Sequence, residues 1–138
     1  MDKKKVLFLC THNSARSQMA EGLLRAMYGD RFEAYSAGTE MTRVNPYVIN
    51  SMAKIGIDLT GHRSKHLNEF INENMDYVVT VCDNAKEACP YFPNAKNRLH
   101  HSFPDPSKFA GEEEEILLEV ANVREEIKSW IAETFGKQ

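Results

Sequence analysis

Short apolar runs alternate with helical patterns in the first part of the chain. Residues 6–9 form a continuous apolar run, which is typical of a strand buried on both faces of a parallel sheet. After a polar turn over residues 11–16, apolar side chains recur at helical spacing as far as Gly29, where the helix is predicted to end. Residues 32–36 alternate between apolar and polar positions, so a second strand is predicted there.

The same alternation continues through the middle of the chain. Asn45 and Pro46 give the N-cap and the first position of a helix that is predicted to end at Gly56. A shorter helix is predicted over residues 67–71, and the apolar run over residues 77–81 predicts another buried strand.

The last third of the chain contains one weak pattern and one strong pattern. Residues 83–89 are polar and compatible with a short helix that Pro90 would end, and residues 98–103 predict a weaker last strand. Residues 112–135 predict a long amphipathic helix, whose opening glutamates complement the positive end of the helix dipole.

Strand–helix alternation of this kind predicts one domain, residues 1–138, of the α/β class. We expect a single doubly wound sheet of four parallel strands flanked by helices. Ligands in such sheets bind outside the carboxyl ends of the strands, near the point where the strand order reverses. Cys10 and Cys82 each follow a predicted buried strand, so both are expected at this edge.

Composition and charge narrow the class of protein. The 138 residues are 42% hydrophobic and 27% charged, which is typical of a folded globular chain. The sequence has no apolar run near the ~20 residues of a membrane span and no secretory signal, so we expect a cytoplasmic protein without a membrane partner. The net charge is −3, and the absence of a stripe rich in Lys and Arg argues against a nucleic-acid partner.

The charges are unevenly distributed. Residues 1–66 carry ten Lys and Arg against six Asp and Glu, whereas residues 67–138 carry seven against fourteen. A basic first half suits an anionic ligand. The alternative is that the acidic C-terminal helix alone creates the difference.

The segment between the first strand and the first helix carries the clearest chemical signal. Cys10 and Arg16 are separated by five residues, and the backbone N–H groups of a loop that leads into a helix can bind a tetrahedral oxyanion. Arg16 would bind two oxygens of that anion, and the same positive environment favours a nucleophilic Cys10 thiolate, to which Ser17 can donate a hydrogen bond. The alternative is a Cys10 that packs as a small apolar residue beside a surface arginine.

The segment resembles the anion loop of the low-molecular-weight protein tyrosine phosphatases. The resemblance continues through Ser36-Ala37-Gly38-Thr39, Gly56-Ile57 and Asp105-Pro106, and so covers nearly the whole chain. It implies that Asp105 is the general acid, although an Asp-Pro turn without a catalytic role is the alternative. It also implies a substrate-binding loop made of Thr11, His12, Asn13, Ser14, Ala15, Arg16 and Ser17.

Three cysteines distinguish reduction from hydrolysis. Hydrolysis of a phosphate ester needs one thiolate, whereas thiols that reduce a substrate supply two electrons and end as a disulfide. Cys89 lies seven residues after Cys82, about 10.5 Å along an ideal helix, and a disulfide needs Cα atoms within ~7 Å. A helical segment would therefore have to unwind or bend before these two residues could join.

The arrangement resembles the thioredoxin-coupled arsenate reductases. The matching segments are Val81-Cys82-Asp83-Asn84-Ala85 and Ala88-Cys89-Pro90. The resemblance implies that Cys10 attacks arsenate while Asp105 protonates the departing oxygen. Cys82 then attacks Cys10 as arsenite leaves, which gives a Cys10–Cys82 disulfide. Cys89 next attacks Cys82 and moves the disulfide outward to Cys82–Cys89, where thioredoxin can reach it. Phosphate is expected to compete for the same loop.

Several positions depart from the families named above. Some members have Gly where His12 stands and Cys where Ala15 stands. The phosphatases tend to have Tyr after the Asp-Pro pair, whereas Ser107 follows it here, which favours the reductase. A phosphatase acting on phosphate esters and a non-catalytic oxyanion or redox sensor are the alternatives.

Some related reductases bind potassium through residues that match Asn13, Glu21 and Ser36, with an Asp in the place of Lys65. An ammonium group there would remove a ligand and repel the ion. We therefore expect no metal and no cofactor. Lys65 would place its charge beside Glu21 or Asn13, or alternatively would point to solvent. The protein is expected to be a monomer.

Overall fold

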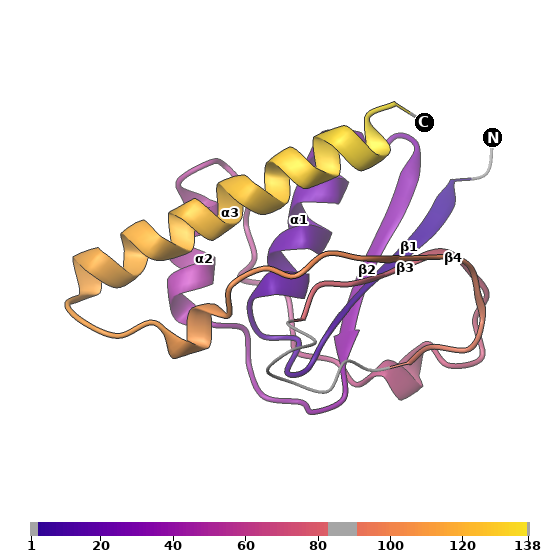
Figure 1. The fold of residues 1–138 in the computed structure, drawn as a ribbon, viewed down its shortest axis with the longest axis horizontal. Coiled ribbons are helices and arrows are strands. Elements are labelled where there is room, and N and C mark those ends of the chain that lie inside the picture. The colour runs from indigo at the N-terminus through magenta and orange to yellow at the C-terminus, as the bar shows by residue number, and fades with distance from the viewer. Residues whose placement is uncertain (1–2, 83–90, 138) are drawn as a thin grey trace.

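The computed structural model describes residues 3–82 and 91–137. Its strands β1 (Lys4–Cys10), β2 (Phe32–Gly38), β3 (Met75–Thr80) and β4 (Ala95–His100) form one sheet in the order β2-β1-β3-β4. All three strand pairs are parallel (Figure 1). The predicted fold class, a four-stranded parallel α/β sheet flanked by helices, is confirmed.

The central strand β1 is buried on both faces of the sheet. Val6 and Phe8 face a core shared with the helices α1 (Arg16–Tyr28), α2 (Pro46–Ala53) and α3 (Glu113–Phe135). Leu7 and Leu9 face a second core, to which the short 3₁₀ helix η1 (Leu67–Glu69) contributes. All four side chains are fully buried, which explains the continuous apolar run that predicted this strand.

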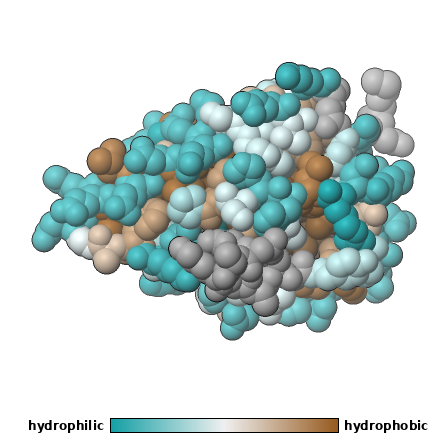
Figure 2. Space-filling model, in the orientation of Figure 1, coloured by the Kyte–Doolittle hydropathy of each residue, from teal (hydrophilic) through white to brown (hydrophobic). Residues whose placement is uncertain are grey.

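The three α-helices pack against one another on one side of the sheet (Figure 1). Every buried side chain of α3 is spaced three or four positions from the next, up to Phe135, whose ring lies edge-on to those of Phe8, Phe32 and Tyr77. The outer side of α3 carries most of the glutamates, and the face of the molecule in Figure 2 is largely hydrophilic. The long helix is therefore stabilised by its apolar stripe.

Most predicted boundaries are close to those in the structure. Asn45 caps α2 by accepting hydrogen bonds from the N–H groups of Tyr47 and Val48, and Pro46 takes the first helical position, as predicted. The helix predicted over residues 67–71 is reduced to η1. The short helix predicted over residues 83–89 lies outside the described residues.

The predicted position of the last strand was wrong by three residues. The sequence predicts it over residues 98–103, whereas β4 spans Ala95–His100. As an edge strand, β4 has mostly exposed or half-buried side chains, so its sequence shows no alternation that marks its limits. The apolar residue Phe103 lies within the predicted range, but it is buried in the loop after the strand.

A last finding concerns membranes. Within residues 3–82 and 91–137, every helix is too short or too polar to span a lipid bilayer.

Candidate active site

The two strands at the centre of the sheet end beside each other. The connection from β1 leads to β2 on one side, whereas β4 pairs with β3 on the other, so the strand order reverses between β1 and β3. Leu9 pairs with Thr80, and the backbone carbonyl of Leu9 accepts a hydrogen bond from Val81. Cys10 and Cys82 therefore come together at the carboxyl edge of the sheet, as predicted, and both are buried.

The loop after β1 holds Cys10 through a short line of hydrogen bonds. The Sγ atom of Cys10 lies 2.9 Å from the hydroxyl of Ser17, and Asn13 Nδ2 donates to that hydroxyl at 2.8 Å. Asn13 has a positive φ of 50°, the left-handed conformation that Asn tolerates better than most residues. Since Ser17 accepts from Asn13, its own proton is available to the sulfur of Cys10.

Gly38 explains how the loop can approach the end of β2 so closely. A Cβ atom at Gly38 would lie 2.5 Å from the carbonyl oxygen of Thr11 and 2.7 Å from that of Cys10. Just beyond it, the N–H groups of Thr39 and Glu40 donate to the Thr11 carbonyl at 2.9 and 3.0 Å. The loop after β1 can lie this close to the end of β2 only because position 38 has no side chain.

Arg16 and Asp105 meet in front of the loop, although 89 positions separate them in the sequence. The Nη2 atom of Arg16 lies 3.6 Å from Asp105 Oδ2, and its Nη1 atom donates to the Phe103 carbonyl at 3.5 Å. Asp105 Oδ1 accepts from the backbone N–H and the hydroxyl of Ser107, at the start of the 3₁₀ helix η2 (Pro106–Lys108). One carboxylate oxygen is thus fixed by the chain, while the other faces the arginine.

A cavity of about 210 Å³ opens between these groups. Its walls are formed by Cys10, His12, Ser14, Ala15, Arg16, Thr42, Asp105 and Ser107. Of the predicted loop residues, Asn13 and Ser17 are fully buried and are not among these lining residues, and neither is Thr11. The structure thus brings Cys10, Arg16 and Asp105 around one small space.

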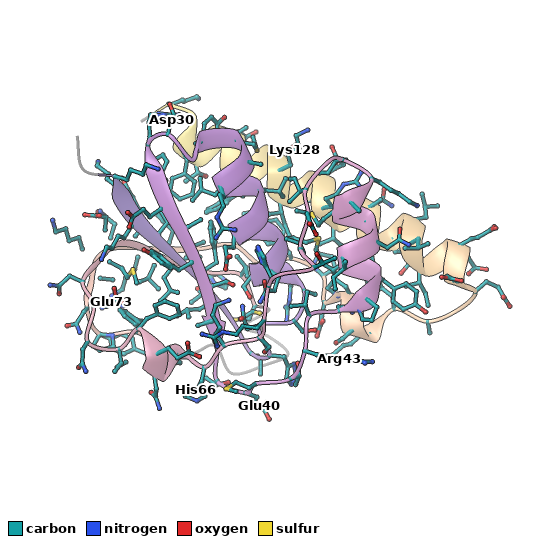
Figure 3. All side chains as sticks on the ribbon, turned by 180° about the vertical axis from the view of Figure 1, so that it is seen from behind. Asp30, Glu40, Arg43, His66, Glu73 and Lys128 are labelled. Carbon is teal, nitrogen blue, oxygen red and sulfur yellow. The ribbon has the colours of Figure 1, made fainter. Side chains whose placement is uncertain are left out.

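Two neighbouring loops complete this end of the molecule. Figure 3 shows Glu40, Arg43 and His66 at the end where the strands of the sheet terminate, and Asp30 at the opposite end. The Nε2 atom of the half-buried His12 lies 3.3 Å from a carboxylate oxygen of the exposed Glu40. These side chains therefore lie at the end of the molecule where the strands of the sheet terminate.

Thr42 is a lining residue that the sequence analysis did not identify. Its backbone N–H donates to the Ser64 hydroxyl at 3.0 Å, and that hydroxyl donates to the His12 carbonyl at 2.8 Å. Thr42 lies in a stretch without regular periodicity, so no local pattern in the sequence indicated its position.

The cysteines differ in their oxidation state. Cys82 is disulfide-bonded, whereas Cys10 is a free, buried thiol. Cys89 lies outside the described residues. Cys10 and Cys82 are therefore close but are not joined to each other in this structure.

A buried charge cluster lies behind the loop. The Lys65 Nζ atom is 3.5 Å from Glu21 Oε1 and donates to the Ser36 hydroxyl at 3.4 Å. Ser36 in turn donates to the same Glu21 oxygen at 2.6 Å. The ammonium therefore lies beside Glu21, as one of the two sequence hypotheses held, and the solvent-facing alternative is wrong.

The charges in this cluster change one another's protonation. Burial by itself raises the pKa of Glu21, but the Lys65 ammonium and the hydrogen bonds from Ser36 and Arg25 outweigh it and hold this pKa below its ordinary value of 4.5. Burial lowers the pKa of Lys65, and the Glu21 carboxylate opposes that change. Glu21 is therefore ionised at neutral pH, and its carboxylate favours the charged form of Lys65.

Comparison with known proteins identifies the family of the chain. The family described as "Low molecular weight phosphotyrosine protein phosphatase" matches residues 5–137. The chain belongs to this family. The resemblance noted in the sequence is thereby confirmed.

Several relatives within the family are named for an activity on arsenate. The chain is 44% identical over 136 residues to "Arsenate reductase 1" of Staphylococcus epidermidis, which covers 99% of this chain and 98% of the relative. It is also similar to a solved structure, "An arsenate reductase in the phosphate binding state", with a TM-score of 0.82 and 30% identity over 97% of this chain and 98% of that one.

A further solved structure names a reductant. The "Corynebacterium glutamicum thioredoxin-dependent arsenate reductase" is 26% identical to this chain, with a TM-score of 0.64. The match covers 96% of this chain and 63% of that longer chain.

Proposed function

We propose that the protein is an arsenate reductase that uses the Cys10 thiolate as its nucleophile. The observation that carries the proposal is the meeting of Cys10, Arg16 and Asp105 around one small cavity. Family members that share at least two-fifths of their sequence with this chain are named arsenate reductases, which supports the choice of substrate.

Binding and the first chemical step follow from the charges of the cavity. Arsenate is tetrahedral and anionic, so the start of α1 and the Arg16 guanidinium would stabilise its oxygens. The sulfur of Cys10 attacks arsenic while Asp105 donates a proton to the departing hydroxyl, which leaves as water. The product is a covalent adduct between Cys10 and arsenic.

Two electrons must then reach arsenic. In the proposed step, Cys82 attacks the sulfur of Cys10, and the electron pair of the sulfur–arsenic bond stays on arsenic, which leaves as arsenite. A Cys10–Cys82 disulfide forms as arsenic is reduced from the +5 to the +3 state. Cys89 then attacks Cys82 and releases Cys10 as a thiolate. The pairing of β1 with β3 brings Cys10 and Cys82 to the same edge of the sheet, which supports a direct transfer between these two sulfurs.

We propose thioredoxin as the reductant that closes the cycle. A structurally similar protein is named for this dependence, which supports the proposal. A relay that ends as a disulfide needs a compartment that keeps thiols reduced, so we place the protein in the cytoplasm. A single chain supplies all the groups of the mechanism, so the proposed working unit is a monomer. Phosphate, which has the same shape as arsenate, is expected to compete.

Hydrolysis of phosphate esters is the second candidate, since the family is described as phosphatases and the same three groups suffice for it. The cavity walls favour the smaller substrate. Within the described part of the chain, the side chains that line the cavity include no Phe, Tyr or Trp, so an aryl phosphate finds only the imidazole of His12 to stack against.

One pair of assays separates the candidates. Arsenite release coupled to thioredoxin, thioredoxin reductase and NADPH is measured beside hydrolysis of p-nitrophenyl phosphate. Arsenate reduction that depends on Cys10 and Cys82 is expected, whereas any ester hydrolysis should depend on Cys10 but survive Cys82→Ser. Ester hydrolysis without arsenate reduction would make the protein a phosphatase, and the absence of both would leave a non-catalytic anion sensor.

A further inference from the structure

A line of hydrogen bonds with a fixed direction leads from residue 65 to Cys10. The backbone N–H of Lys65 and the Nε2 atom of Gln18 both donate to Asn13 Oδ1, at 2.8 and 2.9 Å. Because this oxygen is held by two donors, the amide of Asn13 has only one orientation, and its Nδ2 atom must face Ser17. The proton of the Ser17 hydroxyl is thereby directed at the sulfur of Cys10.

The first donor in this line is held in place by its own side chain. The Lys65 ammonium donates to the Arg63 carbonyl at 3.0 Å and to Ser36, and lies beside Glu21. Only 12% of the Lys65 side chain and 7% of the Glu21 side chain are exposed. A lysine that serves only solubility would extend into solvent, whereas this one ties residues 63–65 to the interior of α1 and β2.

The other carboxylate oxygen of Glu21 is also occupied. Arg25 Nη2 donates to Glu21 Oε2 at 2.7 Å, and His62 Nδ1 lies 3.5 Å from the same oxygen. His62 Nδ1 is also within 2.9 Å of Gln18 Oε1. Glu21 is thus the common anion of a cluster that touches both donors to Asn13.

We propose that Lys65 and Glu21 are positioning residues for the nucleophile. Their ion pair fixes residues 63–65, and the backbone N–H of Lys65 in this segment holds the side-chain amide of Asn13. Asn13 in turn directs the hydroxyl of Ser17 toward Cys10. Neither Lys65 nor Glu21 lines the cavity, so their effect is transmitted through Asn13. The inference rests on the proposed function only in that Cys10 reacts as a thiolate.

The test follows Cys10 itself and requires no arsenate. In a Cys82→Ser/Cys89→Ser background Cys10 is the sole thiol of the chain, and its alkylation by iodoacetamide is measured against pH with and without inorganic phosphate. Lys65→Met is expected to raise the midpoint of this profile by about one pH unit, the equivalent of about one lost hydrogen bond. Protection by phosphate should weaken by about tenfold.

A double-mutant cycle separates positioning from the loss of a nearby positive charge. If Lys65 acts through Asn13 and Ser17, Lys65→Met should have little further effect in a Ser17→Ala background. A displacement of equal size in both backgrounds would show a through-space charge effect and overturn the proposal. The matched control is Lys54→Met, since Lys54 is an exposed lysine, and its profile should coincide with that of the parent.

Stability is separated from positioning by a second variant. Lys65→Met leaves the Glu21 carboxylate with fewer partners, and Glu21→Gln/Lys65→Met removes that buried charge. The midpoint should stay displaced in this double variant even where urea unfolding shows recovered stability. A profile that returns to that of the parent, or an unchanged profile in Lys65→Met, would show that the pair serves the fold alone.

Discussion

Substitution of Gly38 by Ala should damage the site without touching any group that reacts. The added Cβ would lie 2.5 Å from the Thr11 carbonyl oxygen, 2.7 Å from that of Cys10 and 2.9 Å from the Asn13 nitrogen. All three atoms belong to the backbone, so no flexible side chain can move away. Relief requires the loop and the end of β2 to separate by a few tenths of an ångström or more.

The expected magnitudes follow from these contacts. Overpacking of this kind costs about 1–3 kcal/mol of the free energy of unfolding. A displacement of about 1 Å in a catalytic arrangement can lower the rate about a hundredfold, so kcat/KM for arsenate should fall by up to that factor. The loss of activity should therefore be larger than the loss of stability alone would produce, because the variant remains folded.

The assays and the control are direct. Urea unfolding is followed by the fluorescence of Trp130, the single tryptophan, and activity by arsenite release. Gly61→Ala is the matched control, since nothing lies within 4 Å of a Cβ at Gly61, and its stability should change by less than about 1 kcal/mol. A Gly38→Ala variant with activity within twofold of the parent would refute the view that close approach at this glycine shapes the loop.

Four further outcomes are expected. Inorganic phosphate should slow the alkylation of Cys10 by iodoacetamide, because the anion would occupy the loop in front of the sulfur, and alkylation at the same rate with and without phosphate would contradict the anion loop. Cys89→Ser should complete one turnover and stall as a Cys10–Cys82 disulfide, whereas Cys82→Ser should fail before arsenite leaves. Mass mapping of disulfides after one turnover tests both variants. Sustained turnover by Cys89→Ser would exclude Cys89 from the relay. Replacing sodium by potassium at constant ionic strength should leave the activity and Tm unchanged, and Lys65→Asp should create a dependence on potassium; strong, specific stabilisation of the unaltered protein by potassium would contradict this. The pKa of Glu21 is lower in the folded chain than its ordinary value of 4.5, so unfolding in acid takes up a proton. The free energy of unfolding should therefore fall as the pH drops below about 4.5, and it should fall less steeply in Glu21→Gln. Equal slopes of the unfolding free energy against pH, measured by urea titration, would contradict the assignment.

Local sequence patterns predict the helices and strands whose side chains are deeply buried. Residues 6–9 and the apolar stripe of α3 are enclosed by the core, so their periodicity records their surroundings. Asn45 and Pro46 specify the start of α2 through the geometry of the cap alone. The edge strand β4 lies at the other extreme, because pairing with β3 sets its limits and its exposed side chains carry no trace of that pairing.

The residues of the site likewise include some that the sequence predicts and others that it does not. Cys10 and Arg16 were predicted because a loop between a buried strand and a helix has a local signature, and Asp105 because of the resemblance to a family. Gln18 gave no such signal. It is a polar residue on a helix, yet it is fully buried, since it donates to the oxygens of Asn13 and to the Arg63 carbonyl. Only the folded chain brings those acceptors together.

The basic excess in the first half of the sequence acquires a different meaning in the structure. Two of its cations have largely buried side chains and face a carboxylate: Arg16 lies 3.6 Å from Asp105 at the cavity, and Lys65 lies 3.5 Å from Glu21 behind the loop. In the proposed mechanism the front pair must separate, because Arg16 turns its donors to the oxyanion and Asp105 has to hold a proton. The rear pair takes part in no step and keeps its charges throughout. In the proposed mechanism, therefore, the front pair provides the cation that binds the anion, and the rear pair holds the structure behind the loop.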